Sequence, residues 1–154
     1  MLRHVLTTAV VGAFLMQGGA AAGTQVWKAT DIQEKGRALA QKVDATKVAT
    51  EMLGTVGNRS FMVAHREGSG LAEWHEKQAD IMFISSGQVT MTYGGTVVDG
   101  KTTAPGEIRG SGITGGTTVQ LGPGDVLHIP AKTPHQMKLT AGANVTYFVT
   151  KVVE

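Results

Sequence analysis

The chain has 154 residues, and the 42% that are hydrophobic provide enough apolar material for the buried core of one domain. Its 14 basic and 12 acidic residues give a formal net charge of +2. They are dispersed, so no basic cluster could follow a phosphate backbone, and nucleic-acid binding is not expected. The chain has no cysteine, which excludes disulfides, thiolate metal ligands and cysteine nucleophiles.

The first 22 residues have the pattern of a secretory signal peptide. A short basic start, Met1 to His4, precedes an uncharged apolar run from Val5 to Met16, and small residues at 19–22 suit cleavage by signal peptidase. A membrane anchor is the less favoured alternative, because this run is shorter than the roughly 20 residues that span a bilayer. We expect cleavage near residue 22, no stable membrane insertion afterwards, and a periplasmic or secreted protein.

Residues 30–43 predict one short helix. Its apolar residues fall on one helical stripe, formed by Ile32, Leu39, Ala40 and Val43. Thr30 or Asp31 is the expected N-cap. Gly36 lies on the same stripe and weakens the helix by about 1 kcal/mol relative to alanine. We expect this N-terminal helical segment, residues 23–47, to cover a larger domain that spans residues 48–154.

From residue 45 the hydrophobic period changes to two, and short runs recur between glycine-rich turns. The expected strands are 48–56, 60–66, 71–75, 79–85, 87–93, 117–121, 125–129, 135–140 and 145–152. Nine short strands at this spacing predict an antiparallel sandwich or barrel. Gly122-Pro123-Gly124-Asp125 is typical of a type II turn, in which glycine takes the positive φ of the second central position.

Residues 99–116 interrupt this rhythm with a polar, glycine-rich segment that is longer than a hairpin loop. Segments of this length often form a binding loop or a lid, and the sequence leaves the role of this one open. Gly110 to Gly115 match the dinucleotide-binding spacing G-x-G-x-x-G. That motif needs a following helix, whereas a strand and a turn are predicted to follow, so nucleotide binding is not expected.

Acidic residues and histidines gather around the predicted strands. Alternation along strand 71–75 places Glu73 and His75 on one face. Asp80 and His135 each share a face with the apolar residues of their own strands. Two carboxylates and two imidazoles would be costly to bury without partners, and a divalent cation that binds them removes this cost.

Two stretches of the chain resemble the motifs of the cupin superfamily. The residues from Glu73 through His75 and Asp80 to Gly87 resemble the first motif, and Gly122-Pro123-Gly124-Asp125 through Ile129-Pro130 to Pro134-His135 resemble the second. The resemblance covers about residues 60–150. It implies an all-β fold, a single antiparallel β-barrel of jelly-roll type, here with one short N-terminal helix, and commonly a homodimer. It also implies one divalent metal, held by two histidines and a glutamate of the first motif and a histidine of the second.

Carried over by position, His75 matches the second histidine of the first motif, Asp80 its acidic ligand, and His135 the histidine of the second motif. Glu73 stands where the family usually has its first histidine, and Asp80 is shorter than the usual glutamate. The implied metal ligands are therefore Glu73, His75, Asp80 and His135, with two negative charges. Such an oxygen-rich set suits Fe, Mn or Zn better than Cu(I). Glu73 could instead be a catalytic residue that acts as general base beside the metal.

The same residues also allow a site without metal. Glu73 and His75 could form a hydrogen-bonded pair at the mouth of the barrel, and Asp80 could cap a turn. His65 is interpreted as a satisfied core or interface histidine, with a supporting role beside the ligands as the alternative. His128 is interpreted as a sheet-packing residue.

Two functions follow from these alternatives. The first is an exported, metal-dependent enzyme that acts on a small organic substrate. The second is a non-catalytic pocket, free of metal, that binds a sugar or an aromatic acid. A structural role in an envelope assembly, with residues 99–116 as contact surface, is a third hypothesis. No serine lies in a nucleophile-elbow sequence, so seryl chemistry is not expected.

Overall fold

The computed structural model describes residues 23–154, and the predicted signal peptide at 1–22 lies outside the described residues. Within 23–154 the chain forms one helix, α1 (Ala29–Ala40), followed by thirteen strands. The strand pairs are antiparallel, and the predicted all-β class with one short N-terminal helix is confirmed. In this part of the chain no helix combines the length and the apolar character needed to cross a membrane.

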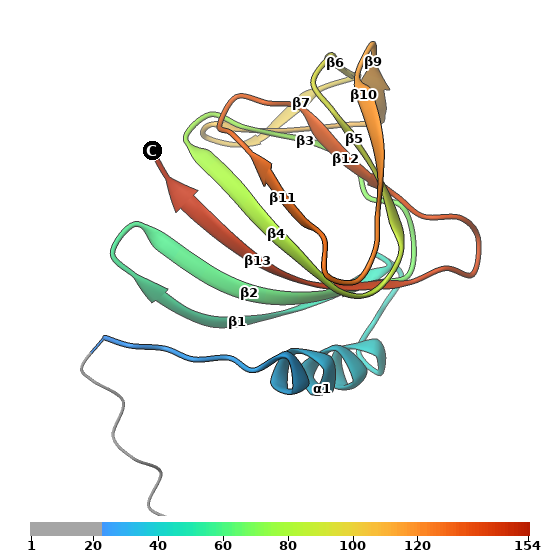
Figure 1. The fold of residues 1–154 in the computed structure, drawn as a ribbon. Helices are drawn as coiled ribbons and strands as arrows, with labels where there is room; N and C mark the ends of the chain where they lie inside the picture. The colour runs from blue at the N-terminus through green and yellow to red at the C-terminus, as the bar shows by residue number, and fades with distance from the viewer. Residues whose placement is uncertain (1–22) are drawn as a thin grey trace, which may run out of the picture.

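Two antiparallel sheets face each other (Figure 1). The five-stranded sheet contains, in spatial order, β1 (Val48–Val56), β2 (Arg59–Arg66), β13 (Val145–Val153), β4 (Gln78–Gly87) and β11 (Val126–Ile129). The six-stranded sheet contains β10 (Thr117–Leu121), β5 (Val89–Tyr93), β12 (His135–Lys138), β3 (Ala72–His75), β8 (Glu107–Gly110) and β7 (Lys101–Ala104). A separate hairpin pairs β6 (Thr96–Val98) with β9 (Gly112–Thr114). All nine predicted strands are present, with ends within two residues of the expected positions.

The main core lies between the two sheets, because every second residue of each strand points into this space. Its buried members are Ala64, Met82, Ile84, Val89, Met91, Leu121, Ile129, Met137, Val145, Tyr147 and Val149. The predicted turn that leads into β11 is also confirmed. Gly124 has φ +94°, and the Asp125 N–H donates to the Gly122 carbonyl at 3.0 Å.

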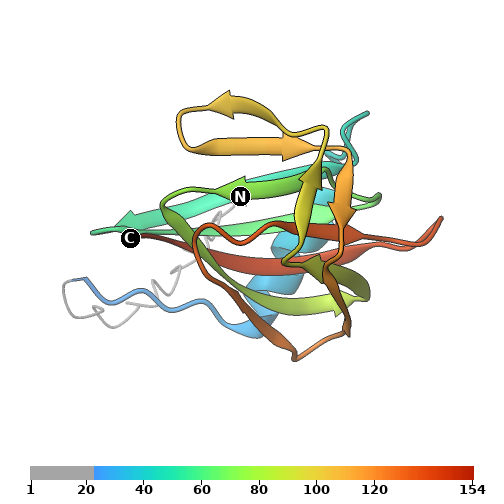
Figure 2. The same cartoon turned by 90° about the horizontal axis from the view of Figure 1, so that it is seen from above.

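Helix α1 packs on the outer face of the five-stranded sheet (Figures 1 and 2). Its residues Ile32 and Leu39 form a second apolar cluster with Val63 of β2, so this part of the predicted stripe is confirmed. The predicted N-cap was wrong. The helix begins after Lys28, whose backbone N–H donates to the Asp31 carboxylate at 2.9 Å, so Asp31 stabilises the helix from its first turn.

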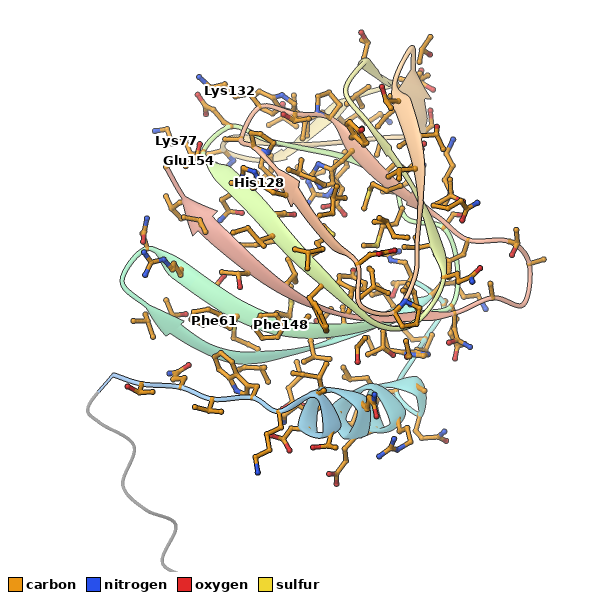
Figure 3. The ribbon with its side chains drawn as sticks, viewed as in Figure 1. Phe61, Lys77, His128, Lys132, Phe148 and Glu154 are labelled. Carbon is orange, nitrogen blue, oxygen red and sulfur yellow. The ribbon has the colours of Figure 1, made fainter. Side chains whose placement is uncertain are left out.

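Aromatic side chains attach the segment before the helix to the same sheet. The Trp27 ring centroid lies 5.0 Å from that of Phe61 and 5.5 Å from that of Phe148. Figure 3 shows Phe61 and Phe148 on the face of the sheet toward this segment. Tilted aromatic pairs at these distances add specific stabilisation to the area they bury.

The segment 99–116, in which the sequence predicted no strand, is not a loop. Most of it forms β7, β8 and β9, and β8 pairs with β3 so that Glu107 lies opposite His75 and Arg109 opposite Glu73. These strands are only three or four residues long, and β7 is exposed along its whole length. They carry no hydrophobic alternation, which is why the sequence pattern did not predict them.

The helix contact depends on Gly36. A Cβ at this position would lie 2.5 Å from Cγ2 and 2.8 Å from Oγ1 of Thr146 on β13. We therefore expect Gly36→Ala to lower the free energy of unfolding by about 1–3 kcal/mol through overpacking, although alanine favours a helix by about 1 kcal/mol. Ala38→Gly, at an exposed position of the same helix, measures how much alanine stabilises this helix relative to glycine when no neighbour is in contact. Urea denaturation measures both, and a stabilised Gly36→Ala variant would disprove the close contact.

Candidate metal centre

The structure brings the four predicted ligand residues together between the two sheets. Glu73 and His75 lie on β3, and His135 lies on β12, where it is paired with Glu73. Asp80 comes from β4 of the opposite sheet. The faces predicted from alternation are confirmed, since His75 and His135 are each 3% exposed and Asp80 is 2% exposed.

The imidazole Nε2 atoms lie between the two carboxylates. Glu73 Oε2 is 3.5 Å from His75 Nε2 and 3.9 Å from His135 Nε2. Asp80 Oδ2 is 3.7 Å from His75 Nε2 and 3.6 Å from His135 Nε2. Ligand atoms bound tetrahedrally at about 2.1 Å stand about 3.4 Å apart, so these separations suit a common metal ion.

Hydrogen bonds fix the orientation of both imidazoles. His135 Nδ1 donates to the Thr133 carbonyl at 3.0 Å, and His75 Nδ1 donates to Glu107 Oε2 at 2.7 Å. Because these oxygens act as acceptors, Nδ1 carries a proton in each ring and Nε2 faces the centre. Within residues 23–154, His135 Nε2 is buried and has no hydrogen-bond partner. A metal ion would satisfy this atom.

Lys151 of β13 is the main site residue that the sequence analysis missed. Its ammonium group donates to both oxygens of Asp80, at 2.8 and 3.0 Å, and lies 3.2 Å from His75 Nε2. The sequence pattern could have predicted its position, because Tyr147, Val149 and Lys151 alternate along one strand and therefore share its inner face. A lysine charge therefore lies beside the position expected for the metal.

Three of the four predicted metal ligands form a group that could hold a metal ion. Glu73, His75 and His135 each offer one ligand atom, and these atoms lie within 4.8 Å of one another. Asp80 lies outside this group, and both of its oxygens already accept hydrogen bonds from Lys151. This His/Glu group could bind a metal. Ligation by Asp80 stays a prediction.

Two residues of β8, Glu107 and Arg109, contact the side chains of His75 and Glu73. Arg109 Nη1 donates to Glu107 Oε2 at 3.0 Å, and Arg109 Nη2 lies 3.5 Å from Glu73 Oε2. The carboxylate of Glu107 thus holds His75, while Arg109 holds both acidic side chains. Glu107 and Arg109 were not predicted as site residues, because their segment has no strand pattern in the sequence.

In the absence of metal, the charges of the site keep Glu73 and Asp80 ionised and His75 protonated. Burial disfavours the Glu73 carboxylate, but the neighbouring His75 imidazole and the charge of Arg109 outweigh it and lower the pKa of Glu73 to about 2. Burial is likewise outweighed at Asp80, where the neighbouring imidazoles of His135 and His75 and the ammonium group of Lys151 hold the pKa well below its usual range. At His75, burial and Lys151 lower the pKa, but Asp80 and Glu73 raise it more strongly, to about 9.

The other two histidines lie apart from this group. His65 is buried on the outer face of the sheet, and its Nδ1 lies 2.8 Å from Thr146 Oγ1, as expected for an interface histidine. His128 was interpreted as a sheet-packing residue, and this was wrong. It is exposed on β11, an edge strand whose outer face is open (Figure 3).

A cavity of about 220 Å³ adjoins the ligand group. Its polar wall includes Arg66, Glu73, Asp80, Arg109, His135 and Lys151. Its apolar wall includes Met62, Leu71, Met82, Met137 and Val149. Pockets for drug-sized ligands measure roughly 300–1,000 Å³, so this cavity suits a smaller molecule.

The raised pKa of His75 makes the stability of the metal-free protein depend on pH. Its folded pKa of about 9 lies above the unfolded value of 6.5, so the stabilisation is complete below pH 6.5 and is lost as the pH rises through 9. In the presence of chelator, we expect the free energy of unfolding to fall by up to about 3 kcal/mol over this window. Denaturant titrations at several pH values measure the fall, which His75→Asn should abolish. Equal profiles for the two proteins would contradict this assignment.

The sequence itself has no match among protein-family models or curated proteins. Solved structures, in contrast, share the fold. A cupin-2 domain from Rhodospirillum rubrum aligns with a TM-score of 0.51 and 15% identity, over 70% of this chain and 61% of that domain's chain. The DMSP lyase from Ruegeria pomeroyi aligns with a TM-score of 0.50 and 17% identity, over 70% of this chain and 48% of the lyase.

A polyketide cyclase from Streptomyces resistomycificus aligns with a TM-score of 0.50 and 18% identity, over 70% of this chain and 66% of the cyclase. The matched part thus spans between about half and two thirds of each of these three proteins. At such low identities the likeness concerns the fold, and it agrees with the two sequence motifs. The chain has the fold of the cupin superfamily.

Proposed function

We propose that the protein is a metal-dependent enzyme that acts on a small organic substrate in the cavity. Glu73, His75 and His135 would hold one divalent ion. The main support is the buried Nε2 of His135, which is aimed at the centre of the group and has no hydrogen-bond partner within residues 23–154. A buried polar atom without a partner costs stability, and a bound cation removes this cost.

The donor set favours Fe, Mn or Zn, because imidazole and carboxylate ligands suit these ions. When bound, the ion would supply Lewis-acid chemistry or lower the pKa of a bound water. The pKa of Glu73, about 2, favours its role as an anionic ligand over that of a general base, which works best with a pKa near the working pH. Arg109, 3.5 Å from Glu73 Oε2, would keep that carboxylate in place.

The fold is compatible with catalysis on small molecules. Two of the similar structures are named as a lyase and a cyclase. The cavity of about 220 Å³ is lined by methionines on one side and by charged groups on the other. Such a wall can bind an apolar body and orient a polar end. The signal-peptide pattern supports an activity outside the cytoplasm.

Lys151 favours a second candidate function, a binding pocket that works without metal. Its ammonium group already neutralises Asp80 and lies 3.2 Å from His75 Nε2. In this alternative the lysine replaces the metal as the cation of the site, and the cavity binds a sugar or an aromatic acid without converting it.

Metal analysis tests the first candidate. We expect protein purified without chelator to carry close to one Fe, Mn or Zn per chain, measured by mass spectrometry of the elements. His135→Ala should lower metal affinity at least about tenfold, because losses of 10–100-fold follow even from removal of groups that only support a ligand. His128→Ala, an exposed histidine away from the site, is the control. If no metal copurifies and none stabilises the fold on titration, the enzyme proposal fails.

Lys151→Met separates the two candidates. The change leaves Asp80 buried without its cation, so we expect the metal-free variant to lose about 3–5 kcal/mol of stability. If the site binds metal, Zn²⁺ or Mn²⁺ should restore most of this loss, since Asp80 then becomes available as a ligand. Thermal melts with and without each ion give the answer. A loss that neither ion restores would support the metal-free pocket.

A further inference from the structure

Three cationic side chains line the cavity, and two of them are paired. Arg109 contacts Glu107 and Glu73, and Lys151 contacts Asp80. Arg66 differs from both. Within residues 23–154 no carboxylate forms an ion pair with it, and its buried Nε has no hydrogen-bond partner.

We propose that Arg66 is the anchor for the carboxylate of a small organic acid, and that such an acid is the substrate or ligand of the cavity. A guanidinium group is planar and always charged, and it binds a carboxylate through two parallel hydrogen bonds. Its Nε atom is buried without a partner, which is unfavourable, and a bound carboxylate compensates for this.

The position of Arg66 on the strand directs its side chain into the cavity. It is the last residue of β2, between Val48 of β1 and Val145 of β13. Met62 and Ala64 precede it by four and two residues, and both pack in the core between the sheets. Because side chains on a strand alternate, Arg66 points to the same side.

Gly70 leaves room for the guanidinium group. A Cβ at Gly70 would lie 3.0 Å from Nη1 and 3.2 Å from Cζ of Arg66, so the group packs against the backbone there. Tyr147 lies beside it. Burial raises the pKa of the Tyr147 phenol, and the charge of Arg66 lowers it less strongly. The hydroxyl therefore stays protonated at neutral pH, and Tyr147 is a neutral neighbour of Arg66.

The charges of the wall favour one negative charge on the bound molecule. In the metal-free protein, the lining residues include three cations, Arg66, Arg109 and Lys151, and two carboxylates, Glu73 and Asp80, which leaves an excess of one positive charge. Glu107 lies behind this wall and is paired with His75. A monocarboxylate balances the excess, whereas a dianionic phosphate would be repelled by the two acids.

The size and the apolar wall define the rest of the molecule. The cavity measures about 220 Å³, and Met62, Met137 and Val149 line it. A short acid with an apolar body, on the scale of butyrate or benzoate, matches this space. A small organic acid would be the substrate of the proposed enzyme, and that part rests on the proposed function. Binding of the acid does not depend on it, because binding is measurable without turnover.

The test compares acids with their neutral amides. Butyrate and butyramide, and benzoate and benzamide, are titrated by calorimetry into the protein with chelator present, so that no metal contributes. We expect each acid to bind at least about tenfold more tightly than its amide, because the charge-assisted pair with Arg66 is lost in the amide. Arg66→Met should remove this preference, and Arg66→Lys should keep only part of it.

Arg59→Met is the matched control, since Arg59 is an exposed arginine at the other end of the same strand. It should leave the preference for acids unchanged. Equal affinity for acid and amide in the wild-type protein would overturn the inference without any variant, and so would a preference that survives in Arg66→Met. Metal content, measured separately, should be the same in Arg66→Met and in the wild type. A protein that prefers acids but carries no metal would refute the enzyme while leaving the role of Arg66 intact.

Discussion

Compensation of buried charge is the constraint on which the pocket depends. Asp80 is almost completely buried between two sheets of largely apolar side chains. An isolated carboxylate in such a place costs several kcal/mol, and a cation with good hydrogen-bond geometry offsets this cost. Lys151 supplies that cation from the neighbouring strand, where it is the direct cross-strand partner of Asp80. The pair therefore also stabilises the register of β13 against β4.

The same lysine compensates for one departure from the cupin pattern, the carboxylate of Glu73 in place of a histidine. The family set implied by the resemblance, three histidines and one glutamate, carries one negative charge when its histidines are neutral. Here Glu73 and Asp80 contribute two negative charges, and Lys151 contributes one positive charge, so the total is again one negative charge. The carboxylate at position 73 and the lysine at position 151 thus compensate each other. A divalent ion bound by Glu73, His75 and His135 would keep an open coordination position, as catalytic sites require.

The sequence predicted those parts of the site that depend on alternation within one strand. Glu73 and His75 share a face, and His135 points inward, because each strand alternates its side chains. What the sequence did not reveal is which distant strands are neighbours. Glu107 reaches His75 only because a short polar strand from the supposed loop pairs with β3. Lys151 could have been placed on an inner face, but its contact with Asp80 follows from the pairing of β13 with β4, which no local pattern specifies.

The arrangement of these residues on two sheets also limits how a substrate can be held. Arg66 and Lys151 belong to the five-stranded sheet, while Glu73 and His135 belong to the six-stranded sheet. An acid held by Arg66, with its other end near Glu73, would therefore bridge the two sheets. The distance between anchor and ligand group is then set by the side chains that separate the sheets, such as Met62 and Met137, rather than by a mobile loop. Packing density is high in such cores, so a change of one methylene there would shift the substrate relative to the reactive groups.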